Sequence, residues 1–176
     1  MDGFALPVKK LKGTDPVETL DLSAKSLGVA SAVVIASLIS VNGSLTSVKL
    51  KGNKLGDEGW GAIFAAICGN KDSKTMSMDV SYENIGFAGG KLIAEALRTS
   101  VTGVLTVANL LRNKLDEESA KMLAEVAKQK GISLCGIQRD QTTADFSNNY
   151  LEPPDAILLA SDLSQAGVTG SLTKIE

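Results

Sequence analysis

Side chains able to do covalent chemistry are few in this chain, and imidazole is missing. The 176 residues contain no His, which excludes the Ser-His, Cys-His and His-zinc classes of site. The two cysteines, Cys68 and Cys135, lie far apart, so the sequence holds neither a zinc spacing nor a disulfide framework. No activating base for either thiol is visible. We expect both cysteines to be small buried hydrophobes.

One glycine-rich segment looks superficially like a phosphate loop. In Gly86-Phe-Ala-Gly-Gly-Lys91 the spacing differs from that motif, and Leu92 stands where a Ser or Thr would hold magnesium. The simpler interpretation is a tight turn that enters a helix, in which Gly89 and Gly90 let a strand and a helix approach closely. No phosphate site is predicted here.

A second segment has part of a calcium-loop pattern. Asp145-Phe-Ser-Asn-Asn149 supplies oxygen ligands, but Tyr150 stands where the loop needs Gly and Ala156 where it needs a bidentate Glu. A strand followed by a turn explains the same residues better. The sequence therefore predicts no catalytic, cofactor or metal residue, and we do not expect an enzyme.

Composition excludes further classes of partner. The 18 basic and 20 acidic residues give a net charge of −2 and aromatic residues make up 4%, which favours neither nucleic acid nor an anionic membrane as partner. The longest apolar stretch, Val29–Val41, is interrupted by serines and too short to span a bilayer. Met1–Lys12 lacks the apolar core of a signal peptide. We expect a cytoplasmic protein.

Five segments of the chain share one pattern of apolar residues. In the clearest copy, Leu45, Val48, Leu50 and Leu55 are apolar and Asn53 precedes the last of them. The last apolar positions of the five copies follow one another at intervals of 28, 30, 30 and 36 residues. Such a period indicates stacked structural repeats. These last positions are Leu27, Leu55, Ile85, Leu115 and Leu151.

Each copy continues into a segment that is typical of an amphipathic helix. After Ile85, for example, Leu92, Ile93 and Leu97 are spaced to form one apolar stripe. Asp57-Glu58 lies where acidic groups stabilise a helix start. Each unit is therefore predicted to be a short strand, a turn and a helix. Stacked units place the strands in a parallel ladder with the helices on one side.

The pattern Leu-x-x-Leu-x-Leu-x-x-Asn-x-Leu, with a full helix after it, resembles the leucine-rich repeat of the ribonuclease-inhibitor-like subclass. The resemblance covers about Val17 to Leu163. It implies an α/β solenoid shaped as a short right-handed horseshoe arc, with parallel strands inside and helices outside. Members of this family act in binding and regulation, as nuclease inhibitors, GTPase activators and actin-capping proteins. Segments near Ser133–Ile137 and Asp155–Leu159 also look like tandem repeat proteins of algae and other protists.

The asparagine column of the repeat is incomplete. Asn53, Asn113 and Asn149 occupy it, whereas Lys25 and Glu83 stand there in the other two copies. An Asn at this position bonds backbone groups of the turn through its side-chain amide. At Lys25 and Glu83 those groups are left to water or to other partners.

The repeats divide the chain into three parts. Residues 1–16 are predicted to be an N-terminal edge segment, with strand-like residues around Ala5–Val8 in which Pro7 prevents further strand addition. About five repeats fill residues 17–163, with an extra strand near 132–137 inside the longest interval. Residues 164–176 open an incomplete further repeat.

The C-terminal edge leaves two alternatives. Leu172-Thr-Lys-Ile175 matches the opening of the second repeat, and a repeat stack normally ends in a polar cap. Either the natural protein continues beyond this point, or the edge pairs with another copy to form a homodimer.

The inner face of the strands supplies the candidate binding residues. Its middle row is predicted to be mixed in charge, in the order Asp21, Lys49, Asp79, Asn109 and Asp145. Neighbours of opposite charge also stabilise a strand ladder by themselves. Val107 and Leu111 break the polar pattern, so they are either exposed anchors for a partner or covered by the chain's own tail or a second copy. The candidates are Asp21, Lys49, Lys51, Asp79, Val107, Asn109, Leu111 and Asp145.

These features favour a non-catalytic scaffold that binds an unidentified protein through the concave strand face. Two alternatives stay open: a regulator of another enzyme, of the GTPase-activator or inhibitor type, and a self-assembling structural unit. No cofactor is expected, and neither nucleic acid nor a membrane is an expected partner.

Overall fold

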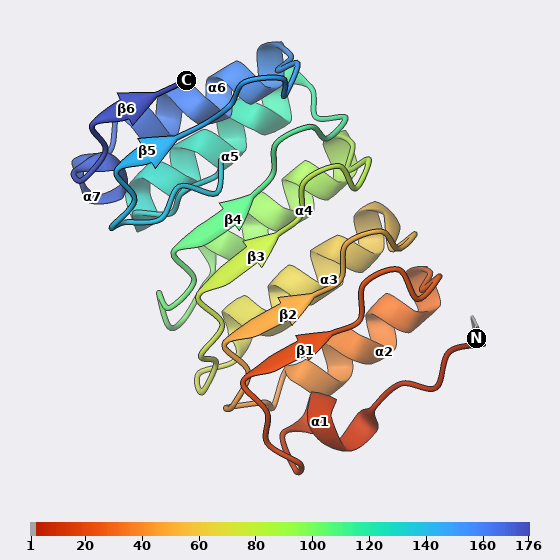
Figure 1. The fold of residues 1–176 in the computed structure, drawn as a ribbon. Helices are drawn as coiled ribbons and strands as arrows, with labels where there is room; N and C mark the ends of the chain where they lie inside the picture. The colour runs from red at the N-terminus through yellow and green to blue at the C-terminus, as the bar shows by residue number, and fades with distance from the viewer. Residues whose placement is uncertain (1–2) are drawn as a thin grey trace.

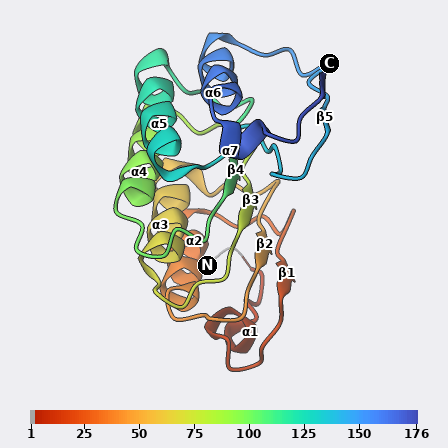
Figure 2. The same ribbon diagram turned by 90° about the vertical axis from the view of Figure 1, so that its left-hand side faces the viewer.

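Short strands and helices alternate along the chain in the computed structural model, which describes residues 3–176. The strands lie side by side in one layer and the helices in a second layer behind it (Figures 1 and 2). The helices are α1 (Val8–Lys12), α2 (Val29–Ile39), α3 (Gly56–Gly69), α4 (Phe87–Arg98), α5 (Glu117–Lys130), α6 (Pro153–Leu163) and α7 (Ala166–Thr169). The strands are β1 (Thr19–Asp21), β2 (Ser47–Lys49), β3 (Ser77–Asp79), β4 (Val107–Asn109), β5 (Thr143–Ala144) and β6 (Lys174–Ile175).

The first four strands form one parallel sheet in the order β1-β2-β3-β4. Its register places Leu20 opposite Val48 and Met78 opposite Ala108. These alternate residues point toward the helices and are buried, because successive side chains of a strand face opposite sides. One continuous core therefore lies between the sheet and helices α2 to α6.

Glycines allow the neighbouring helices to approach closely. A Cβ atom on Gly59 of α3 would lie 2.7 Å from the Cβ of Ala32 on α2. A Cβ on Gly90 of α4 would lie 2.9 Å from that of Ser119 on α5. The sequence predicted that Gly89 and Gly90 bring a helix close to a strand, and that was wrong in part. Gly90 closely approaches both the Leu115 side chain that follows β4 and the next helix, whereas Gly89 approaches Ile85 and Asp57. None of the helices within residues 3–176 has the length and apolar character needed to cross a membrane.

Asn53 links two consecutive turns, as the repeat pattern predicts. Its Nδ2 donates hydrogen bonds to the carbonyls of Leu22 and Leu50. Its Oδ1 accepts from the backbone N–H groups of Lys25 and Leu27, at 3.0 Å each. Asn113 repeats all four of these bonds two intervals further along the sheet, between the turns that follow β3 and β4. These side chains satisfy turn backbone groups that burial removes from water.

A second pair of asparagines holds the opposite ends of the strands. Asn70 donates to the carbonyls of Ile39 and Asn42, and Asn42 donates to the carbonyls of Lys10 and Leu11. The two residues are 28 positions apart, one repeat interval. The sequence predictions missed this pair, although the interval was visible.

The N-terminal segment forms a helix where a strand-like edge was expected. Leu11 is fully buried on α1, which packs against α2. Because Asn42 binds two carbonyls of this helix, the segment turns under the first repeat and does not extend along β1. The strand expectation around Ala5–Val8 was wrong for this reason.

The extra strand-like segment near 132–137, and not the fifth repeat, lies beside β4. Ser133 forms a parallel bridge with Val107, and the N–H groups of Ala108 and Leu110 donate to the carbonyls of Ser133 and Leu134. β5 pairs with β6 in a separate two-stranded sheet. The longest interval of the repeat contains this inserted segment, which displaces the fifth strand from the ladder.

Candidate functional site

The exposed side of the four-stranded sheet, called the strand face below, carries one row of polar side chains. Asp21, Lys49 and Asp79 are exposed and Asn109 is half-buried. The strand register aligns Asp21 with Lys49 and Asp79 with Asn109. The structure therefore brings four of the predicted candidates into one row.

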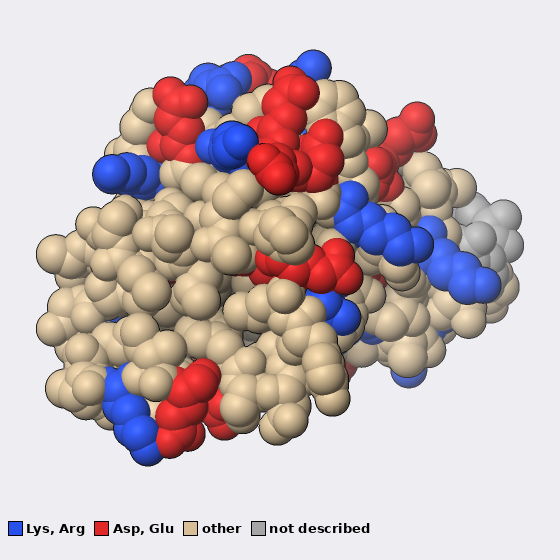
Figure 3. Space-filling model, turned by 90° about the horizontal axis from the view of Figure 1, so that it is seen from above, with Lys and Arg blue, Asp and Glu red and all other residues tan. Residues whose placement is uncertain are grey.

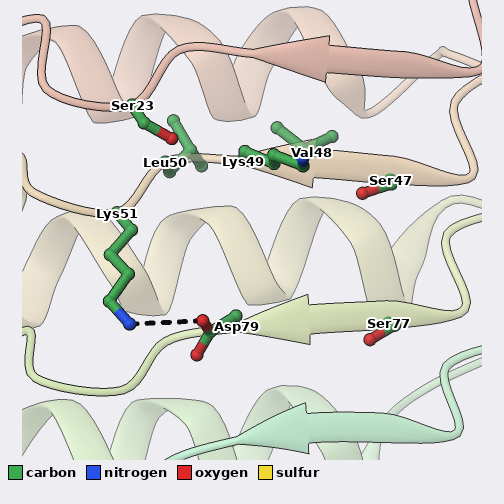
Figure 4. Close-up of a pocket in the computed structure, with 8 residues that line it drawn as sticks. All are labelled: Ser23, Ser47, Val48, Lys49, Leu50, Lys51, Ser77 and Asp79. Carbon is green, nitrogen blue, oxygen red and sulfur yellow. Dashed lines mark hydrogen bonds and ion pairs between the residues drawn. The ribbon is translucent and has the colours of Figure 1, made fainter.

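A shallow pocket of about 330 Å³ lies on this face. Lys51 extends across it toward Asp79 (Figure 4), with its Nζ 3.4 Å from Oδ2 of that residue. The same Nζ lies 3.0 Å from Oγ of Ser81. The pocket combines polar lining residues with the apolar Val48 and Leu50. It is lined by Ser23, Ser47, Val48, Lys49, Leu50, Lys51, Ser77 and Asp79.

The carboxylates of the strand face have hydrogen-bond partners of their own. Oδ1 of Asp79 accepts from the N–H and the hydroxyl of Ser81, at 3.1 and 2.7 Å. Oδ1 of Asp21 accepts from the N–H of Ser23 at 2.9 Å. The hydrogen bonds from Ser23 lower the pKa of Asp21, with smaller contributions from Lys49 and Lys25. Both side chains are thus held in place at the ends of their strands.

Asp145 does not belong to this row. It follows β5 in the two-stranded sheet, where its Oδ1 accepts from the N–H of Ser147 at 2.8 Å. The hydrogen bonds from Ser147 lower its pKa, as those from Ser23 do for Asp21. This Asp145-x-Ser147 motif was visible in the sequence. Its place beside Asn109 was wrong, because the segment near 132–137 occupies that position.

Val107 and Leu111 are buried, so their predicted role as exposed anchors was wrong. Their exposed fractions are 3% and 5%. The same inserted segment explains this burial, since Ser133 pairs with Val107 and a Cβ on Gly136 would lie 3.3 Å from Cγ of Asn109. The cover comes from the chain itself, but from the inserted segment near 132–137 and not from the tail that the sequence analysis named.

The turns that follow β1 to β4, residues 24–26, 52–54, 82–84 and 112–114, form what is called the turn rim below. The first residue of each turn has a left-handed backbone, with φ of 52° at Ala24, 77° at Gly52, 61° at Tyr82 and 60° at Arg112. Gly adopts this conformation without strain, whereas bulky residues rarely do so. Tyr82 and Arg112 are therefore unusual at their positions.

The two side chains meet on the surface. The guanidinium carbon of Arg112 lies 5.8 Å from the centroid of the Tyr82 ring, and Nζ of Lys51 lies 5.4 Å from it. The ring, which is 53% exposed, thus has two cations within cation–π range. The sequence predictions missed both residues, although their placement where the second copy has Gly52 was a visible signal.

Arg112 also connects the turn rim to the last repeat. Its Nη1 donates to the carbonyl of Tyr150 and lies 3.6 Å from Oε1 of Glu152. A second pocket, of about 340 Å³, opens beside it. The pocket is lined by Tyr82, Asn84, Arg112, Asn113, Lys114 and Glu152.

Both thiols are poor nucleophiles at neutral pH. Burial raises the pKa of Cys68 to about 11, and it raises that of Cys135 well above its ordinary value, where Asp162 adds to the effect. Within residues 3–176 no group of three or more Cys, Asp or Glu side chains is placed to hold a metal ion.

Comparison with known proteins identifies the architecture. No family model matches the chain, and no curated protein gives a significant match. A solved structure described as leiomodin-1 actin-binding site 2 superposes with a TM-score of 0.68 at 16% sequence identity, over 90% of this chain and 86% of that one. The chain has a repeat α/β solenoid fold. At this identity the likeness concerns the fold alone.

The end of the solenoid that carries α6 and β6 presents a broad area without charged side chains (Figure 3). Between residues 156 and 173 the one charged residue is Asp162, which is buried. Ile175 of β6 is half-exposed. Dimerisation through this edge stays a prediction.

Glu83 stands at the repeat position that Asn53 and Asn113 occupy in other turns, and it is a buried ionisable residue. Its Oε1 accepts from the N–H of Gly52 at 2.8 Å, and burial is the main cause that raises its pKa. The indole N–H of Trp60 lies near enough to lower that pKa somewhat, although it is outside hydrogen-bond geometry. The Glu83 carboxylate therefore accepts a hydrogen bond from one backbone N–H of the turns, that of Gly52, in place of the missing asparagine.

We expect the variant Glu83→Gln to be more stable than the wild type at pH 7, with the difference shrinking as the pH falls. Because folding raises the pKa of Glu83, its contribution to stability is fully present below the unfolded pKa and lost as the pH rises through the folded pKa. Gln cannot ionise and keeps an acceptor for Gly52. Urea unfolding between pH 4 and 7.5 measures the difference, with exposed Glu125→Gln as control. A pH-independent difference would contradict the expectation.

Proposed function

We propose that the chain is a leucine-rich repeat protein of the ribonuclease-inhibitor-like subclass, and that it is a non-catalytic scaffold which binds a protein through the strand face. The observation that supports this most is the row Asp21, Lys49, Asp79 and Asn109 on one side of a parallel sheet, with the first three side chains exposed and Asn109 half-buried. A stack of packed repeats presents such a row at fixed spacing, which reduces the entropy lost on binding. The side-chain bonds of Asn53 and Asn113 support the repeat assignment.

Two further observations favour binding over catalysis. The buried thiols hold little thiolate at neutral pH, and the carboxylates of the strand face are engaged by neighbouring serines. The solved structure with the same fold is described as an actin-binding site, so this architecture serves protein recognition there. Actin is accordingly one defined partner to assay directly.

The test is affinity capture with the full chain and with the double variant Lys49→Glu/Asp79→Lys, which reverses two exposed charges and leaves the net charge unchanged. We expect the proteins retained by the wild type to be reduced at least about tenfold, since adverse charges at an interface weaken binding strongly. The matched control is Glu117→Lys/Lys121→Glu, which reverses an exposed ion pair on α5.

Purified actin is tested in the same way by co-sedimentation. Equal retention of every protein by the wild type and both variants would refute the strand face as the binding surface. Leu111→Asp is unsuitable in this experiment, because that side chain is buried and the variant would report on folding.

A further inference from the structure

Charge is distributed unevenly over the solenoid. The four strand-and-turn segments 19–27, 47–55, 77–85 and 107–115 carry six Lys or Arg and three Asp or Glu, a formal charge of +3. The whole chain carries −2, so the remaining residues together carry −5. The strand face and turn rim are therefore a basic surface on an acidic protein.

The acidic residues of this surface are already engaged. Asp79 binds Lys51 and Ser81, Asp21 binds the N–H of Ser23, and Glu83 is buried against the N–H of Gly52. Glu152, which lines the second pocket, pairs with Arg112.

Four lysines, in contrast, have no carboxylate within 4.0 Å among the described residues. One of them, Lys25, lies 5.7 Å from the centroid of the Phe4 ring, and the other three have no such neighbour there. Lys49 lies in the middle row of the strand face, and Lys54 and Lys114 occupy equivalent places two strands apart on the turn rim. All three side chains are exposed. Asp21 is the one exposed carboxylate of this surface without a cation within 4.0 Å among the described residues, so the unpaired charge is positive on balance.

An aromatic side chain stands among these cations. Tyr82 projects from a left-handed turn between Lys51 and Arg112, with its hydroxyl donating to Oδ1 of Asn149 at 3.3 Å. Exposed Tyr and Arg side chains that neighbours hold in place are typical anchors of protein interfaces.

We propose that the turn rim and the adjoining strand face bind an acidic segment of the partner protein, with Lys49, Lys54 and Lys114 pairing with its carboxylates and Tyr82 packing against it. This inference rests on the proposed function and specifies the chemistry of the partner. Neighbouring strands are about 4.8 Å apart, so the four turns span roughly 15 Å. An extended segment of five or six residues covers that distance.

The probe is the capped peptide hexaglutamate, added to the ¹⁵N-labelled full chain and followed by NMR. We expect saturable shifts of backbone amides in the turn rim and strand face, which weaken as salt is raised. The triple variant Lys49→Gln/Lys54→Gln/Lys114→Gln is expected to bind about tenfold more weakly, because it loses three exposed charge pairs. The matched control is Lys91→Gln/Lys128→Gln/Lys130→Gln, which removes the same charge from helices α4 and α5.

Several results would overturn the inference. They are shifts confined to the helices, equal weakening by both triple variants, or tighter binding of hexathymidylate than of the peptide at the same residues, which would favour nucleic acid. A second variant, Tyr82→Asn, tests the anchor: Asn tolerates the left-handed turn, so weaker peptide binding with unchanged thermal stability supports a contact of the ring, and unchanged binding refutes it.

The two proposals fail separately. If affinity capture depends on Lys49→Glu/Asp79→Lys but hexaglutamate does not bind, the scaffold function stands and the acidic partner is wrong. If the peptide binds but no captured protein depends on the strand face, the basic surface stands and the scaffold function is wrong.

Discussion

Replacing Asn113 with Ala is expected to lower the free energy of unfolding by about 3–5 kcal/mol. The side chain is buried and makes four hydrogen bonds, to the carbonyls of Val80 and Leu110 and from the N–H groups of Glu83 and Ile85. Alanine leaves all four backbone groups in the interior without these partners. A loss of this size is several times the effect of an ordinary surface substitution. Urea or thermal unfolding followed by circular dichroism measures it.

Asn149→Ala is the matched control, since Asn149 belongs to the same column of the sequence. In the structure its side chain accepts one long hydrogen bond, from the Tyr82 hydroxyl at 3.3 Å. Its removal is expected to change the free energy of unfolding by less than about 1 kcal/mol. Similar losses for the two variants would show that the bonds of Asn113 are not what stabilises the turns.

This difference between two identical residues shows how far the sequence pattern reaches. The spacing of apolar residues predicted the strands and helices of the regular repeats. A helix buries one apolar stripe and a strand buries alternate residues, and both patterns can be seen in the local order of the residues. Stacking of consecutive repeats predicted the order β1 to β4, but the spacing did not show which segment pairs with the far edge of β4. The inserted segment near 132–137 pairs with the free edge of β4, where the repeat pattern would place β5.

The candidate site follows the same division. Asp21, Lys49, Lys51, Asp79 and Asn109 were predictable, since they alternate with buried residues in strands whose register is regular. The burial of Val107 and Leu111 and the position of Asp145 depend on a contact between segments distant in sequence, which no local pattern specifies. In the same way, the meeting of Tyr82 and Arg112 depends on two turns being stacked.

Replacing Asp162 with Ala is also expected to lower the free energy of unfolding by about 3–5 kcal/mol. This fully buried side chain of α6 accepts from the hydroxyl of Ser133 at 2.7 Å and from the N–H groups of Leu134 and Cys135 at 2.8 and 2.9 Å. These bonds fix the inserted segment beside β4. Without them three buried donors lose their acceptor, and the cover over Val107 loosens.

The loss from Asp162→Ala is expected to be larger at pH 4 than at pH 7. Burial is the main cause that raises the pKa of Asp162, so its stabilising contribution is fully present below the unfolded pKa and declines as the pH rises through the folded pKa. Urea unfolding across this range compares the variant with the wild type. The control Asp140→Ala, an exposed residue nearby, is expected to change stability by less than about 0.5 kcal/mol. A loss that grows toward neutral pH would mean that the ionised carboxylate is the stabilising form and that its charge-assisted bonds outweigh burial.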